Sequence, residues 1–98
     1  MPASLDRFRS LLREKLPSLK ADYRVESMGI FGSFLHGTER PDSDLDILVS
    51  FSEKPSLFRL IDLENQLSDW LEVKVDLVLR SALKPRIGER VLKEVVPV

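Results

Sequence analysis

The stretch Met28–Ser50, MGIFGSFLHGTERPDSDLDILVS, decides the fold of this chain. Its first apolar run ends in Gly32 and Ser33, and a second apolar run opens with Asp44 and Asp46. Apolar runs separated by glycine and polar residues predict a strand, a tight turn, a short helix, a loop and a second strand. The residues that can do chemistry therefore lie where these two strands end and begin.

Gly32 and Ser33 form a candidate phosphate cradle. A glycine lets the backbone approach a ligand closely, and Ser33 stands in the first turn of a short helix expected from Ser33 to about His36. Free N–H groups and the helix dipole at such a position attract an anion such as a phosphate. The pair therefore supplies one half of a possible site.

Three aspartates supply the other half. Asp44 and Asp46 alternate along a strand, so their side chains point to the same face, roughly 6 to 7 Å apart. Two carboxylates so placed repel each other unless a cation lies near them, and magnesium prefers such oxygen ligands. Asp76 is a third acid within a later apolar run. This pattern predicts a site for a divalent cation.

Each feature alone also has a purely structural interpretation. A glycine-serine pair after a strand is most often a turn, and alternate aspartates can be the solvated face of an edge strand. The combination is more informative, because Gly32-Ser33, ten intervening residues, the Asp44-x-Asp46 pair and the later Asp76 occur in one short chain. Together they favour nucleotide chemistry.

Two amphipathic helices are predicted to cover the sheet. The first runs from about Ser4 to Leu16 and ends at Pro17, because proline disfavours helical geometry in the residue before it. The second opens at Pro55 and Ser56. Their apolar stripes are expected in the core, and they consist of Leu5, Phe8, Leu12 and Leu16 in the first helix and of Leu57, Leu60, Leu63, Leu67, Trp70 and Leu71 in the second.

The remaining pattern completes the expected sheet. Val25–Phe31 is predicted to be a central buried strand, Leu45–Val49 a second strand, and Glu72–Leu79 a third with clear alternation. A last helix is expected over Pro85–Glu94, and Val95–Val98 is too short to assign. The fold class is therefore α/β (α+β), with a mixed sheet of three or four strands flanked by helices.

Length and composition narrow the possible functions. With 98 residues, the chain 1–98 is expected to form a single domain without room for a second substrate domain, so a large acceptor must come on another chain. A formal net charge of −1 gives no bulk attraction to nucleic acid or to a membrane. No cysteine, signal core or membrane-spanning run is present in the sequence, which favours a cytoplasmic protein.

The motif Gly32-Ser33, Asp44-x-Asp46 and Asp76 resembles that of the DNA polymerase beta nucleotidyltransferase superfamily. The small size resembles its minimal nucleotidyltransferase branch, which includes antitoxins paired with HEPN-domain toxins. The resemblance covers almost the whole chain from Arg24 to Val98. It implies a polymerase-beta-like fold, a nucleoside triphosphate substrate and magnesium.

The same resemblance implies roles for individual residues. Gly32 and Ser33 would hold the triphosphate, and Asp44 and Asp46 would coordinate two magnesium ions. Asp76 would complete the metal site and help to activate the acceptor hydroxyl. One departure from the family pattern is His36, where relatives often carry arginine or another residue before the second glycine.

The leading hypothesis is a magnesium-dependent nucleotidyltransferase that moves AMP from ATP to a tyrosine, serine or threonine hydroxyl of a partner HEPN-type toxin. It would act as the antitoxin, and a hetero-oligomer with the toxin is expected. Alternatives are a non-catalytic binding antitoxin, a nucleotide-binding subunit and an antibiotic nucleotidyltransferase, the last disfavoured because the chain has no residues for a drug-binding domain. Base preference, acceptor residue and the roles of His36, Arg40 and Arg86 are left open by the sequence.

Overall fold

A mixed four-stranded sheet with the strand order β3-β2-β1-β4 organises the chain. The computed structural model describes residues 3–37, 40 and 43–98. Strand β1 (Val25–Phe31) and strand β2 (Leu45–Phe51) are antiparallel and lie at the centre. Strand β3 (Val75–Leu79) runs parallel to β2, and the short β4 (Val96–Pro97) is antiparallel to β1. The predicted mixed sheet is therefore confirmed, with four strands.

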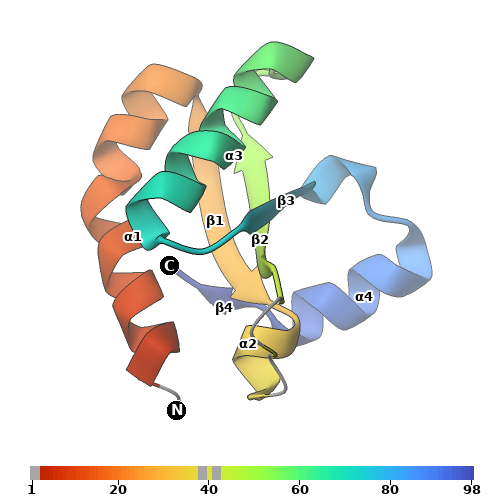
Figure 1. Cartoon of the computed structure of the whole chain (residues 1–98). Helices are drawn as coiled ribbons and strands as arrows, with labels where there is room; N and C mark the ends of the chain where they lie inside the picture. Colours follow the sequence, from red (N-terminus) through yellow and green to blue (C-terminus); the bar gives the residue numbers. More distant parts are fainter. Residues whose placement is uncertain (1–2, 38–39, 41–42) are drawn as a thin grey trace.

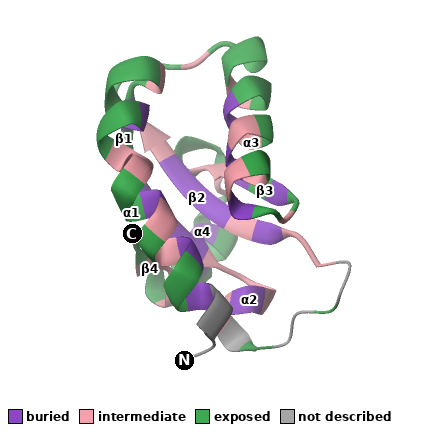
Figure 2. Ribbon diagram, turned by 60° about the vertical axis from the view of Figure 1, so that its left-hand side comes forward, coloured by how far each residue is buried: buried purple, intermediate pink, exposed green. Residues whose placement is uncertain are grey.

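Two long helices cover one face of this sheet. Helix α1 (Ala3–Tyr23) and helix α3 (Leu57–Leu71) lie side by side against it, as Figure 1 shows. Figure 2 shows their buried residues turned toward the strands and their exposed residues turned outward. The core between the layers is apolar, and its fully buried side chains are Leu5, Leu12, Leu19, Ile30, Leu45, Ile47, Val49, Leu63, Leu67, Leu71 and Val75.

Helix α1 is longer than the sequence predicts, because it continues through Pro17 to Tyr23. Proline removes a backbone hydrogen bond and costs a helix interior about 3 kcal/mol. The turns after Pro17 make contacts that offset this cost. Leu19 is only 1% exposed, and the Tyr23 hydroxyl donates a hydrogen bond to Asp62 at 2.7 Å. The prediction that the helix ends at Leu16 is wrong because tertiary packing outweighs the local preference.

Helix α3 begins where the sequence predicts. Ser56 is its N-cap, and the Ser56 hydroxyl accepts a hydrogen bond from the Arg59 backbone N–H at 3.2 Å. The first turn is not part of the core, however, because Leu57 is 68% exposed and the neighbouring Phe58 is 85% exposed. The expectation that the whole stripe is core is therefore wrong for Leu57, since the helix rises away from the sheet at its N-terminal end.

Strand β3 lies at an edge of the sheet, and α3 covers that edge. Its Val75 N–H donates to the Ser68 hydroxyl and its Leu77 N–H donates to the Glu64 carboxylate, both at 3.0 Å. These side chains satisfy backbone donors that would otherwise be open to another strand. The contacts also fix the position of β3, and with it the position of Asp76.

The other edge is formed by the end of the chain. The 3-10 helix η1 (Arg80–Ala82) leads to helix α4 (Pro85–Glu94), and β4 follows. Helix α4 has the predicted bounds, but β4 was not assigned from the sequence because it has only two residues. Arg9 of α1 donates to the Pro97 carbonyl at 3.3 Å, which ties this strand to α1.

Helix α2 (Ser33–His36) stands beside the open ends of β1 and β2, as predicted. In the part of the chain that the structure describes, no helix has the length and apolar character needed to cross a membrane.

Candidate active site

Asp46 and Asp76 lie side by side on the sheet face that α1 and α3 leave uncovered. They are register partners in the parallel pair of β2 and β3, so their side chains share one face. That face is opposite to the core, because Asp46 alternates with the buried Leu45 and Ile47. We refer to the surface that carries Asp46 and Asp76 as the acid face. The predicted grouping of these two acids is present.

The electrostatics of Asp46 reflect this crowding. Its pKa is raised from 3.8 to about 6, first by burial and then by the negative charges of Asp76 and Asp44. A hydrogen bond between the Asp46 and Asp76 side chains contributes in the same direction. Asp44 is thus close enough to act on Asp46, although it precedes β2 and is not part of it. The three predicted acids form one electrostatic group.

Gly32 brings the candidate phosphate cradle into contact with this group. Its φ of 86° lies in the region that favours glycine. A Cβ at this position would collide with the Asp46 carboxylate, so only glycine lets the turn lie against the acid. Ser33 follows as the first residue of α2. The turn and the acids, predicted separately from sequence, are therefore contiguous.

The other residues of interest are placed less tightly. The Arg40 N–H donates to the Ser43 hydroxyl at 2.8 Å, and the Ser43 N–H donates to the Arg40 carbonyl at 2.9 Å. This turn sets the start of the segment that carries Asp44. Arg86 is exposed on α4. His36 ends α2, and its side chain lies outside the described part of the structure.

The donor chemistry of the acids fits a hard divalent cation. A positive ion would relieve the same repulsion that raises the pKa of Asp46. Among the described residues, however, no three histidine, cysteine, aspartate or glutamate side chains form a ready-made ion site. The predicted set of Asp44, Asp46 and Asp76 is thus present as a hydrogen-bonded pair with a third acid nearby, and not as a preformed cage.

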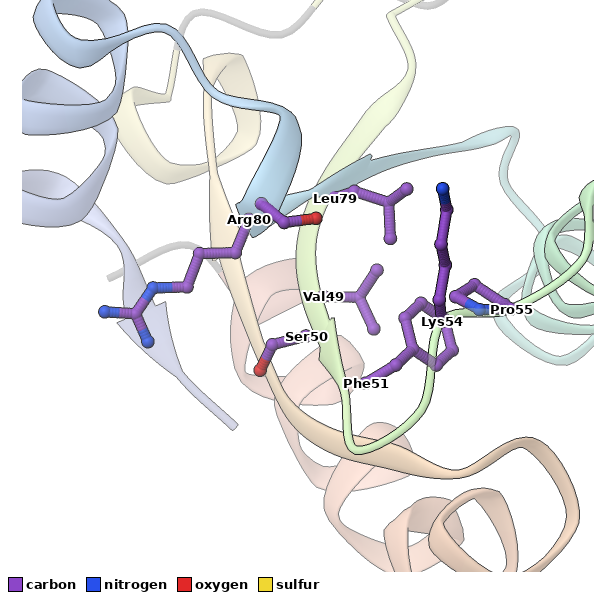
Figure 3. Close-up of a pocket in the computed structure, with 8 residues that line it drawn as sticks. Val49, Ser50, Phe51, Lys54, Pro55, Leu79 and Arg80 are labelled. Carbon is purple, nitrogen blue, oxygen red and sulfur yellow. The ribbon is translucent and has the colours of Figure 1, made fainter.

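A larger cavity lies elsewhere, near the far end of β2. It has a volume of about 700 Å³ and is lined by Val49, Phe51, Lys54 and Leu79, among others (Figure 3). The lining residues of β2 follow Asp46 by three to five positions, or roughly 10 to 17 Å of strand. Figure 3 also shows the Arg80 guanidinium on the opposite side of β2 from Lys54. This cavity is therefore separate from the acids.

Sequence reasoning missed three polar residues near the acid face. Ser50 alternates with Asp46 along β2, and Ser27 is its register partner on β1, with the two hydroxyls 2.5 Å apart. Arg80 follows β3 directly. The alternation of Asp46, Leu48 and Ser50 along β2 could have placed Ser50 on the acid face from the sequence alone. The position of Ser27 could not have been predicted in this way, because it depends on the strand register.

The family follows from comparison with known proteins. A model of the polymerase beta nucleotidyltransferase family matches residues 14–98. This chain belongs to that family. It is 43% identical over 93 residues to the protein adenylyltransferase MntA of Thermococcus cleftensis, which covers 95% of this chain and 94% of the relative. The chain is therefore an MntA homologue, as the motif predicts.

Solved nucleotidyltransferase structures agree with this assignment. One described as a minimal nucleotidyltransferase superposes with a TM-score of 0.79 at 39% identity, covering 96% of this chain and 95% of the other. A second contains a tri-AMPylated HEPN toxin of Shewanella oneidensis in complex with an MNT antitoxin, and it matches with a TM-score of 0.61. At 20% identity, over 96% of this chain and 67% of that one, the second match concerns the fold alone.

Proposed function

We propose that this nucleotidyltransferase transfers AMP from ATP to a hydroxyl group on a partner HEPN-type toxin, and that the transfer silences the partner. The observation that carries the proposal is the contact between the Gly32 turn and Asp46, which itself pairs with Asp76. A phosphate cradle and an acidic group meet at one point of an exposed sheet face. The protein adenylyltransferase relative at 43% identity supports the same chemistry.

The reaction requires the chain to position a triphosphate and a hydroxyl around one phosphorus atom. The acceptor oxygen forms a bond to the α-phosphorus, and the bond from that phosphorus to the bridging oxygen of pyrophosphate breaks. The backbone at Gly32 and Ser33 would hold the leaving pyrophosphate end of ATP. Magnesium, held by Asp44, Asp46 and Asp76, would supply positive charge beside the phosphate oxygens.

Asp76 is the acid best placed to take the acceptor proton. It is exposed, whereas Asp46 beside it is half-buried, so an incoming hydroxyl reaches Asp76 more readily. Its hydrogen bond to Asp46 orients the carboxylate on the acid face. Holding both reactants in line in this way lowers the barrier mainly through positioning.

A non-catalytic antitoxin is the second candidate, and one observation favours it. Leu57, Phe58 and Ile61 form an exposed apolar surface at the start of α3, with exposed fractions of 68%, 85% and 48%. Such a surface is typical of a protein contact. A partner bound there could be silenced by coverage alone, without any AMP transfer.

Intact mass spectrometry separates the two candidates. The partner toxin, incubated with this protein, ATP and magnesium, should gain one or more AMP units in mass and lose its activity. The Asp44→Asn/Asp46→Asn double variant should produce neither change. If the double variant silences the toxin as well as wild type does, with no added mass in either case, the binding mechanism is correct and the transfer is not.

A further inference from the structure

Three large apolar side chains that the structure leaves exposed lie together in the first turns of α3. Leu57, Phe58 and Ile61 are 68%, 85% and 48% exposed. Leu57 and Ile61 are four residues apart on one helix, so they share a face, and Phe58 follows Leu57 directly. We call these three residues the apolar ridge. Exposed apolar side chains that cluster in this way mark a contact surface, whereas scattered ones do not.

The apolar ridge is held in place by contacts between α3 and the end of α1. Arg59 donates a hydrogen bond to the Asp22 carbonyl, and the central carbon of its guanidinium lies 5.4 Å from the centre of the Tyr23 ring. The Tyr23 hydroxyl in turn donates to Asp62, one turn further along α3. The ridge is therefore fixed before any partner binds, which lowers the entropic cost of association.

The cavity of about 700 Å³ near the far end of β2 lies at the foot of this ridge. Its apolar walls include Val49, Phe51, Pro55 and Leu79 (Figure 3). Helix α3 leaves the cavity uncovered, because the first buried residue of this helix is Leu63. Val49 and Phe51 point to the side of the sheet that carries the core, since they alternate with the residues of the acid face. The cavity therefore opens on the side opposite to the acids.

Phe58 does not fill the cavity of its own chain. It follows Pro55 by three residues, so the two Cα atoms are at most about 11 Å apart. Yet Phe58 is not among the lining residues, and it is 85% exposed. An apolar cavity of about 150 Å³ takes one benzene ring. The larger cavity beside Phe58 thus has room for a phenylalanine ring from another molecule together with a neighbouring apolar side chain.

A face that bears both a projecting ring and a cavity for such a ring is complementary to itself. A two-fold axis between Phe58 and the cavity exchanges the two, so that each copy inserts its ring into the other and both contacts form at once. A stable interface takes about 800 Å² and 20 to 30 residues from each partner. The segments 49–62 and 79–81 approach this number of residues and place apolar side chains at the centre with polar ones around them.

The charges on this face also favour a second copy of the chain. Around the ridge and the cavity, Glu53 and Asp62 are balanced by Lys54 and Arg59, so two identical faces do not repel each other. Residues 84–94, which also expose apolar side chains, contain four basic and two acidic residues. Two copies of that helix would repel each other. Self-association is thus electrostatically permitted at α3 and disfavoured at α4.

We propose that this protein forms a two-fold symmetric homodimer in which Phe58 of each copy enters the cavity between Pro55 and Leu79 of the other. The inference goes beyond the proposed function, because the acids lie on the opposite side of the sheet. The dimer leaves both acid faces open. It also occupies the surface on which silencing by coverage alone depends.

The mass of the protein in solution tests the dimer. Light scattering after size-exclusion chromatography, carried out over the micromolar range, should give twice the chain mass of 11.2 kDa for wild type. Phe58→Asp should give the mass of one chain, because a buried carboxylate replaces the ring at the centre of the interface. Aspartate suits the first turn of a helix, so this variant is expected to fold, and thermal melting verifies it. A monomeric wild type, or a dimeric Phe58→Asp, overturns the proposal.

Ile87→Asp is the matched control. Ile87 is 55% exposed and stands in the first turn of α4, so the substitution has the same chemistry and the same relation to a helix dipole. This variant should keep the dimer mass. A monomeric Ile87→Asp overturns the assignment of the interface to α3.

Mixing two variants tests the pairing of ring and cavity. Phe58→Asp keeps the cavity and lacks the ring, whereas Ser81→Trp keeps the ring and fills the cavity from its exposed position in the lining. Neither variant alone can form a ring-to-cavity contact, but one copy of each can form one such contact. Native mass spectrometry should show a mixed dimer in the mixture and none in either variant alone. A mixture that stays monomeric overturns the pairing.

The partner toxin is the other occupant that this face could take, and binding measurements distinguish it. If wild type is monomeric and Phe58→Asp loses affinity for the toxin while Ile87→Asp keeps it, the face is a toxin contact and the homodimer is wrong. These measurements need neither ATP nor transfer. Failure of the proposed AMP transfer would therefore leave the result for the dimer unchanged.

Discussion

The two faces of strand β2 show how one short segment divides stability from chemistry. Leu45, Ile47 and Val49 are fully buried under α1 and α3, whereas Asp46 between them is half-buried on the open face. The buried set follows the hydrophobic effect, and burying each such side chain is worth about 1.5 to 3 kcal/mol. Asp46 instead raises the energy of the fold, because burial and two neighbouring carboxylates disfavour its charge. Adjacent residues therefore have opposite thermodynamic roles.

Substitutions at neighbouring positions of β2 should separate these roles most sharply. Ile47→Ala leaves a cavity in the core and should lower the free energy of unfolding by about 3 kcal/mol. Asp46→Asn should leave the protein no less stable and should reduce AMP transfer by at least about a hundredfold, since it removes a central carboxylate of the site. Urea denaturation and the transfer assay measure the two effects. Clear destabilisation by Asp46→Asn would mean that this acid serves the fold.

The parts of the fold and of the site that depend on local sequence can be predicted, whereas those that depend on packing between distant residues cannot. The strand pattern of Met28–Ser50 and the Asp-x-Asp spacing depend on local periodicity, so β1, β2 and the shared face of the acids follow from the chain alone. The passage of α1 through Pro17 does not, because it depends on packing of Leu19 against distant residues. The contact between Gly29 and Val95 does not follow either, because these residues are far apart in sequence and meet only in the folded sheet.

Two glycines provide the next comparison, because both have positive φ but only one touches the acids. Gly32 has φ 86° and Gly37 has φ 69°, so alanine at either position should cost about 1 to 2 kcal/mol in backbone strain. A side chain at Gly32 would also displace the Asp46 carboxylate, whereas nothing lies within 4 Å of the Gly37 position. Gly32→Ala should therefore abolish transfer, and Gly37→Ala should retain it. Thermal melts and transfer rates of both variants are measured. Equal losses of activity in the two variants would contradict the assignment of Gly32 to a phosphate cradle.

Removal of divalent cations should weaken nucleotide binding at the acid face. The carboxylates of Asp44, Asp46 and Asp76 repel the triphosphate unless positive charge lies between them. ATP affinity in EDTA should therefore be lower than in magnesium by about tenfold, or 1.4 kcal/mol. Isothermal titration calorimetry measures both affinities at the same ionic strength. Equal affinities would exclude a metal-bridged nucleotide, and Asp46→Asn in EDTA is expected to recover part of the loss.

The smallest expected effect is a dependence of stability on pH that belongs to Asp46. Its pKa in the folded protein, about 6, lies above the ordinary value of 3.8, so the folded state binds this proton more tightly than the unfolded state does. The stabilising contribution is complete below about pH 4 and is lost as the pH rises through about 6. The melting temperature of Asp46→Asn should consequently equal that of wild type at pH 4 and lie a few degrees above it at pH 7. After allowance for solvent screening, the difference corresponds to about 1 kcal/mol.

A control for net charge makes this last comparison specific to the acid face. Asp69→Asn removes the same formal charge from an exposed position on α3, and Asp69 is not among the charges that raise the pKa of Asp46. Melting curves of wild type and both variants are recorded in EDTA from pH 4 to pH 7. Only for Asp46→Asn should the melting temperature rise relative to wild type as the pH rises, because only this change removes a carboxylate that the fold holds beside two others. The difference in melting temperature between Asp46→Asn and wild type could instead stay constant with pH, or Asp69→Asn could show the same difference. Either result would show that the crowding at Asp46 has no thermodynamic consequence.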